Sequence, residues 1–336
     1  MICLGIESTA HTFGIGIIKN KKILANALDM YTTKPGQGIV PMDAAEHHKE
    51  VKEKVLADAL EKAGIKEEQI DAVAYSKGAG LAPSLLVGME FARELAKKLK
   101  KPLVPVCHQI AHIEIGKMLT GAQDPVVLYT SGANTQILGY ADEFYRCFGE
   151  CMDVGVGNAL DKFGRRAGLG FPAGPKIEEL ARKGSYIELP YVVKGMDLSF
   201  SGIITSALDK LEKGNKLEDV CFSLQETVFA MLTEVTERAL AHTGKKELLV
   251  TGGVAANKRF RDMLEIMCNE RKAIFYTVPK EYSGDNGVNI AWTGLVAYES
   301  GVQEEPEQAD IAPRWRTDDA KVTWIYFYSK KNKRYL

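Results

Sequence analysis

The chain has 336 residues, of which 46% are hydrophobic and 26% are charged. At roughly 150 residues per domain, this length predicts two globular lobes with cores of their own. The 43 basic and 44 acidic residues nearly cancel, which excludes a global positive field that would attract a polyanion. A basic tail at residues 330–334 can supply a local positive patch, or it can be only a solubilising chain end.

Six cysteines are scattered along the chain. The closest pair has three residues between its members, unlike the spacing of thiolate metal sites and redox motifs, so we expect a reducing, intracellular setting. Residues 1–6 are too short for a signal peptide, and no stretch approaches the ~20 apolar residues that cross a bilayer. We therefore predict a soluble, cytoplasmic protein without a membrane partner.

The first half of the chain is predicted to form a β-meander followed by a βαβ unit with a parallel pair of strands. Its predicted elements are strands at 1–6, at 13–18 and after the turn at 20–22, then a strand at 70–75, a glycine loop at 78–84, a helix at 85–100 and a strand at 103–106.

The second half repeats this layout. Its predicted elements are a strand at 126–129, a polar turn at 131–134, a strand at 135–138, a strand at 247–251, a sharp glycine turn at 252–253 and a helix at 255–270. Meander hairpins followed by α/β material, occurring twice, are typical of sugar kinases, chaperone ATPases and actin. A fold alone does not fix chemistry.

These elements predict three segments. Residues 1–124 are expected to form an N-terminal lobe, residues 125–296 a C-terminal lobe, and residues 297–336 a final segment that packs back on the first lobe. Residues 142–215 are rich in glycine and poorly periodic, so we predict an insertion that borders a cleft.

Two histidines are candidate metal ligands. His108 and His112 are spaced i, i+4 just beyond a predicted strand, so a helix that starts there would place both imidazoles on one face. Asp285, in a turn before a predicted helix, can supply a third ligand. Two imidazoles and one carboxylate favour iron or zinc over magnesium. The alternatives are a chance histidine pair and a turn or capping aspartate.

Polar and glycine-rich turns are candidate anion sites. The turns at 131–134, 155–157 and 252–253 can each present unpaired backbone amides to a phosphate. Further candidates are a possible phosphate turn of Glu7, Ser8 and Thr9, a purine or ribose contact from Asn257, and ribose contacts from Asp161 and Glu178. Each of these side chains, taken alone, is more often an ordinary polar surface residue.

Seven motifs follow one another in a specific order. They are HQIAHIEIG at 108–116, YTSGANTQ at 129–136, DKF at 161–163, KGMDLSFSG at 194–202, FSLQE at 222–226, GGVAAN at 252–257 and DNG at 285–287. Together they resemble the universal tRNA threonylcarbamoyladenosine synthase family. The sequences of these motifs are similar to those of the family's archaeal and eukaryotic branch, the catalytic subunit of the KEOPS complex. The likeness spans residues 1 to about 316.

The resemblance implies an ASKHA fold, the two-lobed α/β fold with a duplicated core found in actin, sugar kinases and chaperone ATPases. It also implies one iron or zinc ion and an adenylate or ATP-type ligand. The implied metal ligands are His108, His112, Tyr129 and Asp285. The implied nucleotide and substrate residues are Tyr129, Thr130, Ser131, Gly132, Ala133 and Asn134 for the phosphate and acyl end, Asp161, Gly174, Glu178 and Asn257 for the adenosine, and Gly252 with Gly253.

The implied reaction is acyl transfer to tRNA. A threonylcarbamoyl group moves from threonylcarbamoyl-adenylate, made by a separate synthase, to N6 of the adenosine beside the anticodon in tRNAs that read codons beginning with A. AMP is released, and no general base can be named. The implied partners are a kinase-like ATPase and small dimerising and regulatory subunits, which would also help this near-neutral chain to bind tRNA.

Four positions depart from the family's usual sequence. Ala133 and Ala173 stand where glycine is usual or frequent, Ala79 replaces a proline, and Cys107 replaces an asparagine. If residue 133 requires a positive φ, alanine there would cost on the order of 1 kcal/mol. Cys107 can be an inert buried thiol or an extra metal ligand.

Other functions of the same fold fit the residues less well. A small-molecule kinase would use magnesium held by carboxylates, and Glu7-Ser8-Thr9 departs from the Asp-Gly-Thr wording typical there. A metallopeptidase needs His-Glu-x-x-His, but Gln109 occupies the glutamate position. A non-catalytic ATP-binding scaffold would be expected to lose the metal ligands, which are all present. The kinase and the scaffold remain the alternatives.

Overall fold

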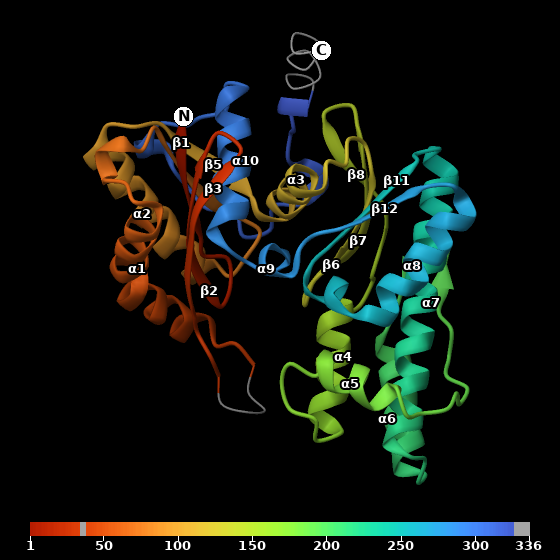
Figure 1. The fold of residues 1–336 in the computed structure, drawn as a ribbon. Coiled ribbons are helices and arrows are strands. Elements are labelled where there is room, and N and C mark those ends of the chain that lie inside the picture. The colour runs from red at the N-terminus through yellow and green to blue at the C-terminus, as the bar shows by residue number, and fades with distance from the viewer. Residues whose placement is uncertain (34–37, 326–336) are drawn as a thin grey trace. The chain divides into compact units, whose positions relative to one another are not determined.

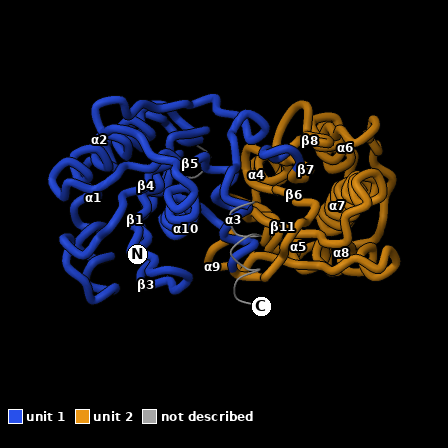
Figure 2. The backbone as a smooth tube through the Cα atoms, turned by 90° about the horizontal axis from the view of Figure 1, so that it is seen from above, with its two compact units in different colours: residues 1–118, 141–145, 284–336 blue, residues 119–140, 146–283 orange. Residues whose placement is uncertain are grey.

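The structure is a computed structural model that describes residues 1–33 and 38–325, drawn as a ribbon in Figure 1. The basic tail at 330–334 lies outside the described residues. None of the helices in the described part of the chain is long and apolar enough to cross a membrane. The chain divides into two compact units, coloured in Figure 2: unit 1 with residues 1–118, 141–145 and 284–336, and unit 2 with residues 119–140 and 146–283.

Unit 1 contains a mixed five-stranded sheet with the order β3-β2-β1-β4-β5. The pairs β1/β2 and β2/β3 are antiparallel, while β1/β4 and β4/β5 are parallel. The predicted meander and βαβ unit are therefore confirmed. The strands are β1 (Ile2–Glu7), β2 (Thr12–Lys19), β3 (Lys22–Met30), β4 (Ala72–Gly78) and β5 (Leu103–Cys107).

Helices cover both faces of this sheet because its strands alternate between large and small residues. Leu4 and Ile6 of β1 belong to a core shared with α1 (Pro41–Ala63) and α2 (Ala82–Leu99). Gly5 lies between them and faces α10 (Gly287–Glu299), where a Cβ on Gly5 would lie 2.1 Å from the Ala291 backbone nitrogen. The lack of a side chain at Gly5, Gly14 and Gly16 lets α10 pack directly on β1 and β2.

The remaining elements of unit 1 follow the sheet. α3 (His108–Thr120) begins immediately where β5 ends, as the sequence predicts, and its residues 108–116 are buried. The indole N–H of Trp292 on α10 donates to the carbonyl of Glu114 on α3 at 3.0 Å, which ties the two helices together. Short 3-10 turns occur at η1 (Glu67–Gln69), η3 (Pro306–Gln308) and η4 (Thr317–Asp319).

Unit 2 contains a second five-stranded sheet with the order β12-β11-β6-β7-β8. β6 pairs antiparallel with β7 and parallel with β11, and β11 pairs parallel with β12. Counted from the hairpin, this order is the same as in unit 1, so the predicted duplication of the α/β core is confirmed. The strands are β6 (Val126–Thr130), β7 (Thr135–Ala141), β8 (Phe144–Glu150), β11 (Glu247–Thr251) and β12 (Ile274–Thr277).

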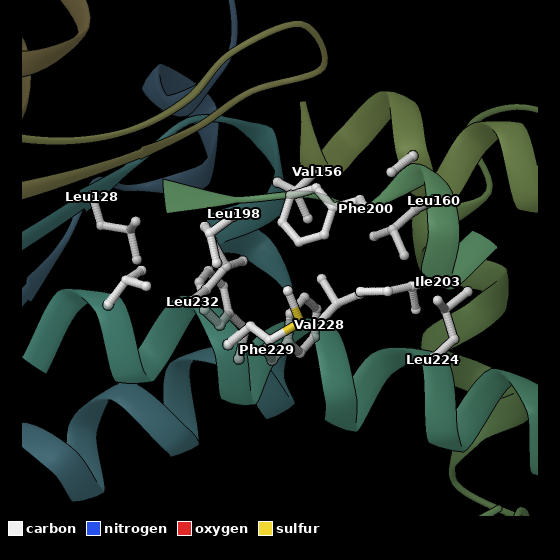
Figure 3. Close-up of a cluster of buried hydrophobic side chains, with 14 of the residues drawn as sticks. Leu128, Val156, Leu160, Leu198, Phe200, Ile203, Leu224, Val228, Phe229 and Leu232 are labelled. Carbon is white, nitrogen blue, oxygen red and sulfur yellow. The ribbon is translucent and has the colours of Figure 1, made fainter. Parts of the chain in front are cut away.

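Residues 142–215 are more regular than their sequence predicts. They contain β8, three helices and a small β9/β10 ladder, and their apolar residues join the buried cluster drawn in Figure 3 with the long helix α7. The buried residues of α4, at positions 156, 159, 160, 163 and 164, follow the helical period, so the prediction of poor periodicity is wrong there. The elements are α4 (Val156–Arg166), α5 (Gly174–Ala181), β9 (Val193–Lys194), β10 (Asp197–Leu198), α6 (Ser201–Glu212) and α7 (Leu217–Thr243).

The unit boundaries differ from the predicted lobe boundaries. Residues 284–296, placed by sequence in the second lobe, belong to unit 1 because α10 packs on the glycine-bearing face of its sheet. Residues 119–124 belong instead to unit 2. The last elements of unit 2 are η2 (Gly253–Ala256), α8 (Lys258–Arg271) and α9 (Lys280–Ser283).

Candidate functional site

Two histidines and one aspartate converge in unit 1. His108 is the first residue of α3 and His112 lies one turn later, so both rings project from one face. Oδ1 of Asp285, in the turn before α10, lies 3.4 Å from Nε2 of His108 and 3.2 Å from Nε2 of His112. One ligand atom from each residue lies within 4.8 Å of the others, and no other such histidine, cysteine and carboxylate group occurs among the described residues.

Hydrogen bonds orient both imidazoles. Nδ1 of His108 lies 3.0 Å from Oε2 of Glu7, a carboxylate that is 1% exposed. The other oxygen of Glu7 accepts the backbone N–H of Thr9 at 2.7 Å and the Thr9 hydroxyl. Nδ1 of His112 lies 3.4 Å from the side-chain nitrogen of Asn289. With both Nδ1 atoms engaged, the Nε2 atoms face the aspartate, and such supporting contacts are typical of histidines that bind metals.

The electrostatics of this group favour a cation. Burial alone would lower the pKa of His108, but the carboxylates of Glu7 and Asp285 raise it well above its usual value. Burial lowers the pKa of His112. Burial alone would raise the pKa of Asp285, whereas the two histidines hold it well below its usual value. The Asp285 carboxylate is therefore charged at neutral pH, and a metal ion can replace the proton on His108.

The donor set fits a transition metal. Two imidazole nitrogens and one carboxylate oxygen suit iron or zinc and leave coordination positions open, whereas magnesium prefers oxygen ligands. The side chain of Asp285 is 23% exposed, and those of His108 and His112 are 10% and 2% exposed, so the group is accessible mainly from the aspartate side. Tyr129, the predicted fourth ligand, is buried at the end of β6 in unit 2, and its part in the metal site stays a prediction.

Cys107 matches the first of its two alternatives, an inert buried thiol. It is 4% exposed, and its thiol donates to Oε1 of Gln109 at 3.3 Å. Burial raises the pKa of the thiol to about 12, so it carries a proton at neutral pH. A protonated, hydrogen-bonded thiol is a poor metal ligand.

The predicted phosphate turn in unit 1 has other partners. The backbone N–H of Ser8 donates to the hydroxyl of Ser76 at 3.0 Å, and that of Thr9 donates to Glu7. These two amides are thus occupied, and the buried carboxylate of Glu7 would repel a phosphate. The geometry therefore favours Glu7 as the support of His108, a role that the sequence analysis missed together with that of Asn289.

The turn between β6 and β7 in unit 2 is different. The Ser131 N–H donates to the carbonyl of Asn134 at 2.9 Å, and the Asn134 N–H donates to the Ser131 hydroxyl at 3.0 Å. Within the described residues, the amides of Gly132 and Ala133 have no hydrogen-bond partner, so two adjacent N–H groups remain for an anion. Ala133 does not have a positive φ, and the strain considered for alanine at this position is absent.

The start of α4 is joined to this turn by hydrogen bonds. The Gly157 N–H donates to the carbonyl of Ser131 at 3.2 Å, and the Asn158 N–H donates to that of Gly132 at 3.0 Å. The Val156 N–H donates to the hydroxyl of Thr135 at 2.8 Å, so the expectation of unpaired amides at 155–157 is wrong for Val156 and Gly157. The helix instead fixes the shape of the turn.

Glycine also permits the turn after β11 to approach the end of β6 closely. Gly252 has a φ of +95°, and a Cβ there would lie 2.3 Å from the carbonyl oxygen of Thr130. Gly253 is the first residue of η2 and has open space around its Cα. Thr130, the glycine pair and the turn at 131–134 thus lie side by side in unit 2, and we call them the cradle.

Asn257 links three elements near the cradle. It is the N-cap of α8, and its Oδ1 accepts the Phe260 N–H at 3.1 Å. Its Nδ2 donates to Oε1 of Gln225 on α7 at 3.0 Å. Gln225 is 4% exposed, and a buried glutamine in an apolar helix is the signal by which sequence could have identified it.

The two predicted ribose carboxylates each hold a backbone amide. Oδ1 of Asp161 accepts the Ala173 N–H at 2.7 Å, next to Gly174 at the start of α5. Oε1 of Glu178 accepts the Lys258 N–H at 3.0 Å. Burial raises the pKa of Asp161. Each carboxylate is anchored through one oxygen, and the second oxygen can accept a ligand hydroxyl.

Comparison with known proteins gives a family. The sequence profile described as tRNA N6-adenosine threonylcarbamoyltransferase matches residues 22–292. A protein of that name from Thermococcus kodakarensis is 53% identical over 96% of this chain and 100% of its own length. A probable bifunctional tRNA threonylcarbamoyladenosine biosynthesis protein from Methanocaldococcus jannaschii is 49% identical, and the match covers 99% of this chain and 62% of that protein.

Solved structures of low sequence identity share the fold. HypF from T. kodakarensis superposes with a TM-score of 0.62 at 17% identity, over 89% of this chain and 47% of that one. The activator of 2-hydroxyisocaproyl-CoA dehydratase from Clostridium difficile gives a TM-score of 0.53 at 13% identity, over 93% and 100%. The predicted ASKHA fold is confirmed. The matched profile and the near full-length identity together show that this chain belongs to the tRNA N6-adenosine threonylcarbamoyltransferase family.

Proposed function

We propose that the chain transfers a threonylcarbamoyl group from threonylcarbamoyl-adenylate to N6 of the adenosine beside the anticodon, in tRNAs that read codons beginning with A. Membership of the family supports this reaction. The observation that carries its chemistry is the convergence of His108, His112 and Asp285. A small-molecule kinase would need oxygen ligands for magnesium, and a non-catalytic scaffold would not need this group at all.

The metal would be iron or zinc, held by His108, His112 and Asp285, and Tyr129 is the proposed fourth protein ligand. When bound, such an ion polarises a carbonyl or phosphoryl oxygen as a Lewis acid. Glu7 keeps the His108 ring in the orientation that presents Nε2, because it lies 3.0 Å from Nδ1.

The cradle in unit 2 binds the adenylate. The free amides of Gly132 and Ala133 hold its phosphate, which carries the charge that AMP retains as it leaves. The second oxygens of Asp161 and Glu178 accept the ribose hydroxyls, and Asn257 contacts the adenosine from the start of α8. The binding set is completed by Tyr129, Thr130, Ser131, Asn134, Gly174, Gly252 and Gly253.

The protein accelerates the reaction chiefly by positioning. The new bond joins N6 of the acceptor adenosine to the carbamoyl carbon, the bond from that carbon to the AMP phosphate oxygen breaks, and N6 loses a proton. The mixed anhydride is already activated, while an exocyclic amine is a weak nucleophile. Holding the two at near-attack distance therefore supplies much of the acceleration. No residue is assigned as a general base.

Partner proteins contribute to tRNA binding. The chain has 43 basic and 44 acidic residues, so the isolated protein lacks the global positive charge that neutralises many phosphates. A kinase-like ATPase and small dimerising and regulatory subunits of the KEOPS type are the proposed partners, and a separate synthase supplies the adenylate. Weak tRNA binding by the isolated chain is expected in filter binding. Tight, salt-sensitive binding without partners would contradict this.

Reconstitution tests the function. Labelled threonine, bicarbonate, ATP, the adenylate-forming enzyme, the partner subunits and tRNA are combined with the wild type, His108→Ala or Asp285→Ala. The matched control is His242→Ala, which changes an exposed histidine of unit 2. We expect incorporation by the wild type and the control, and a loss of at least about 100-fold in the two site variants, with metal content measured in parallel. Equal incorporation by all four proteins would defeat the proposed site.

A further inference from the structure

One face of α4 is polar and exposed along its whole length. Asn158, Lys162, Arg165 and Arg166 are exposed, whereas Phe163 and the other apolar residues of the helix are buried in the core of unit 2. Positions 158, 162, 165 and 166 are spaced i, i+4, i+7 and i+8, so the four side chains lie on one face. We call Lys162, Arg165 and Arg166 the α4 cations.

The α4 cations are not neutralised locally. Within the described residues, none of the three makes an ion pair at 4.0 Å or less, although Arg165 acts electrostatically on Asp161. The segment at 162–183 contains six basic and two acidic residues, in a chain whose net charge is −1. This segment is therefore locally positive, although the chain as a whole is nearly neutral.

The α4 cations are continuous with the cradle. Asn158, at the start of the same exposed face, donates its backbone N–H to Gly132 of the cradle turn at 3.0 Å. At about 1.5 Å per residue, Arg166 lies roughly 12 Å farther along the helix axis. The positive face thus begins at the turn that has two free amides and extends outward from it.

An exposed aromatic ring lies in the loop that follows the same helix. The loop after α4 folds back on it, because the Leu169 N–H donates to the carbonyl of Gly164 at 2.8 Å and the Ala173 N–H donates to Asp161. Between these anchors, Phe171 is 70% exposed. Exposed aromatic rings beside cations are the usual means of binding single-stranded nucleic acid, because bases stack on the ring.

We infer that the α4 cations and Phe171 bind the single-stranded part of the acceptor RNA that adjoins the reacting adenosine. The inference rests on the proposed function, since the acceptor base must reach an acyl group held at the cradle. The cations contact phosphates and Phe171 stacks on an unpaired base. All four are positioning residues, because they would contact the RNA next to the reacting adenosine and not the reacting atoms. An acidic surface on a partner protein is the competing occupant.

The test uses the reconstituted, metal-loaded complex and measures kcat and KM for tRNA as a function of salt. The main variant is Lys162→Ala with Arg166→Ala, which leaves Arg165 and its effect on Asp161 in place. We expect KM for tRNA to rise about tenfold or more with kcat within about twofold. The slope of log kcat/KM against log salt should become shallower by about 1.4, at ~0.7 per lost phosphate contact.

Three further variants separate the effect of charge from that of structure. Lys162→Arg with Arg166→Lys keeps both charges and should restore the wild-type KM and salt slope. Phe171→Ala should raise KM for tRNA several-fold without changing the salt slope, while Phe171→Trp should not. The matched control removes Lys19, Lys21 and Lys22, three exposed lysines of the β2/β3 hairpin in unit 1, and should leave both quantities unchanged.

The outcomes distinguish this inference from the proposed function. Incorporation by the wild type supports the function whatever the variants do. Unchanged KM and salt slope in the Lys162/Arg166 double variant would overturn the inference alone. A variant that loses binding of a partner subunit in pull-down, while KM for tRNA is unchanged at saturating partner, would show that the face binds protein and would also overturn it.

Discussion

The same hairpin turn has opposite chemistry in the two units. In unit 1, Glu7 is the last residue of β1 and its buried carboxylate lies against His108, while the amides of Ser8 and Thr9 in the turn donate to side chains. In unit 2 the turn after β6 has no acidic side chain, and within the described residues the amides of Gly132 and its neighbour are free. One turn therefore stabilises a cation, and the other is suited to an anion.

This difference shows how a duplicated fold acquires two functions. Both sheets have the same strand order, so each first hairpin delivers its turn to an equivalent place. Whether the turn binds a positive or a negative group then depends on a single carboxylate and on whether its amides are already paired. The predictions below alter one unit and use the other as the reference.

The largest effect is expected from Gly252→Ala in unit 2. Its φ of +95° and the 2.3 Å approach of the added Cβ to the Thr130 carbonyl should lower the free energy of unfolding by about 3 kcal/mol. Incorporation of labelled threonine should fall because the cradle is distorted, while metal binding by unit 1 should persist. Urea unfolding and metal analysis of the folded protein measure both. A loss below about 1 kcal/mol with full activity would show that the cradle tolerates the side chain.

Glu7→Gln alters the turn of unit 1. The amide oxygen can still accept a hydrogen bond from Nδ1 of His108, but it carries no negative charge, so metal affinity should fall roughly 10- to 100-fold. The matched control is Glu226→Gln in unit 2, which removes a carboxylate paired with Arg259 at 2.7 Å and should leave metal affinity unchanged. Competition with a chelator gives the dissociation constants. Equal metal affinity of the Glu7→Gln and Glu226→Gln variants would contradict the role assigned to Glu7.

Low pH should lower the stability of unit 1 through His48, which is fully buried beside Phe13. Burial lowers the pKa of His48 to about 4. The stability that depends on a neutral His48 is therefore fully present above the usual histidine pKa of about 6.5. It is lost as the pH falls towards 4, because the unfolded chain binds the proton first. At pH 5 the expected loss is about 2 kcal/mol.

His48→Phe should remove this loss. The wild type should lose about 2 kcal/mol more than the variant between pH 7.5 and 5 in urea unfolding. The only histidine of unit 2 is the exposed His242, so hydrogen exchange should increase first in unit 1. Identical pH dependence of the two proteins would mean that His48 is not neutral in the folded state.

The smallest effect is expected from Ala133→Gly, which restores the residue usual in the family. Because Ala133 does not have a positive φ, glycine relieves no strain and should lower the free energy of unfolding by up to about 1 kcal/mol. KM for the adenylate should stay within about twofold. A clear gain in stability or in adenylate binding would show that alanine distorts the cradle.

The sequence predicted the elements with strong local signals. The β-branched strands of both hairpins and the i, i+4 spacing of His108 and His112 depend on residues close in the chain. The partner of His108 was not predictable in this way, since Glu7 lies 101 residues away and meets it only through the parallel sheet. Likewise, the placement of α10 on unit 1 depends on the close approach allowed by Gly5, which no periodicity reveals.

The most direct test is a titration of the metal-free chain with Co²⁺, followed by its visible absorption. The wild type should bind one equivalent with a spectrum typical of nitrogen and oxygen ligands, and Cys107→Ser should bind it equally well. His108→Ala, His112→Ala and Asp285→Ala should each weaken binding by about 100-fold or more. Full binding with an unchanged spectrum in any of these three, or its loss in Cys107→Ser, would contradict a shared ion.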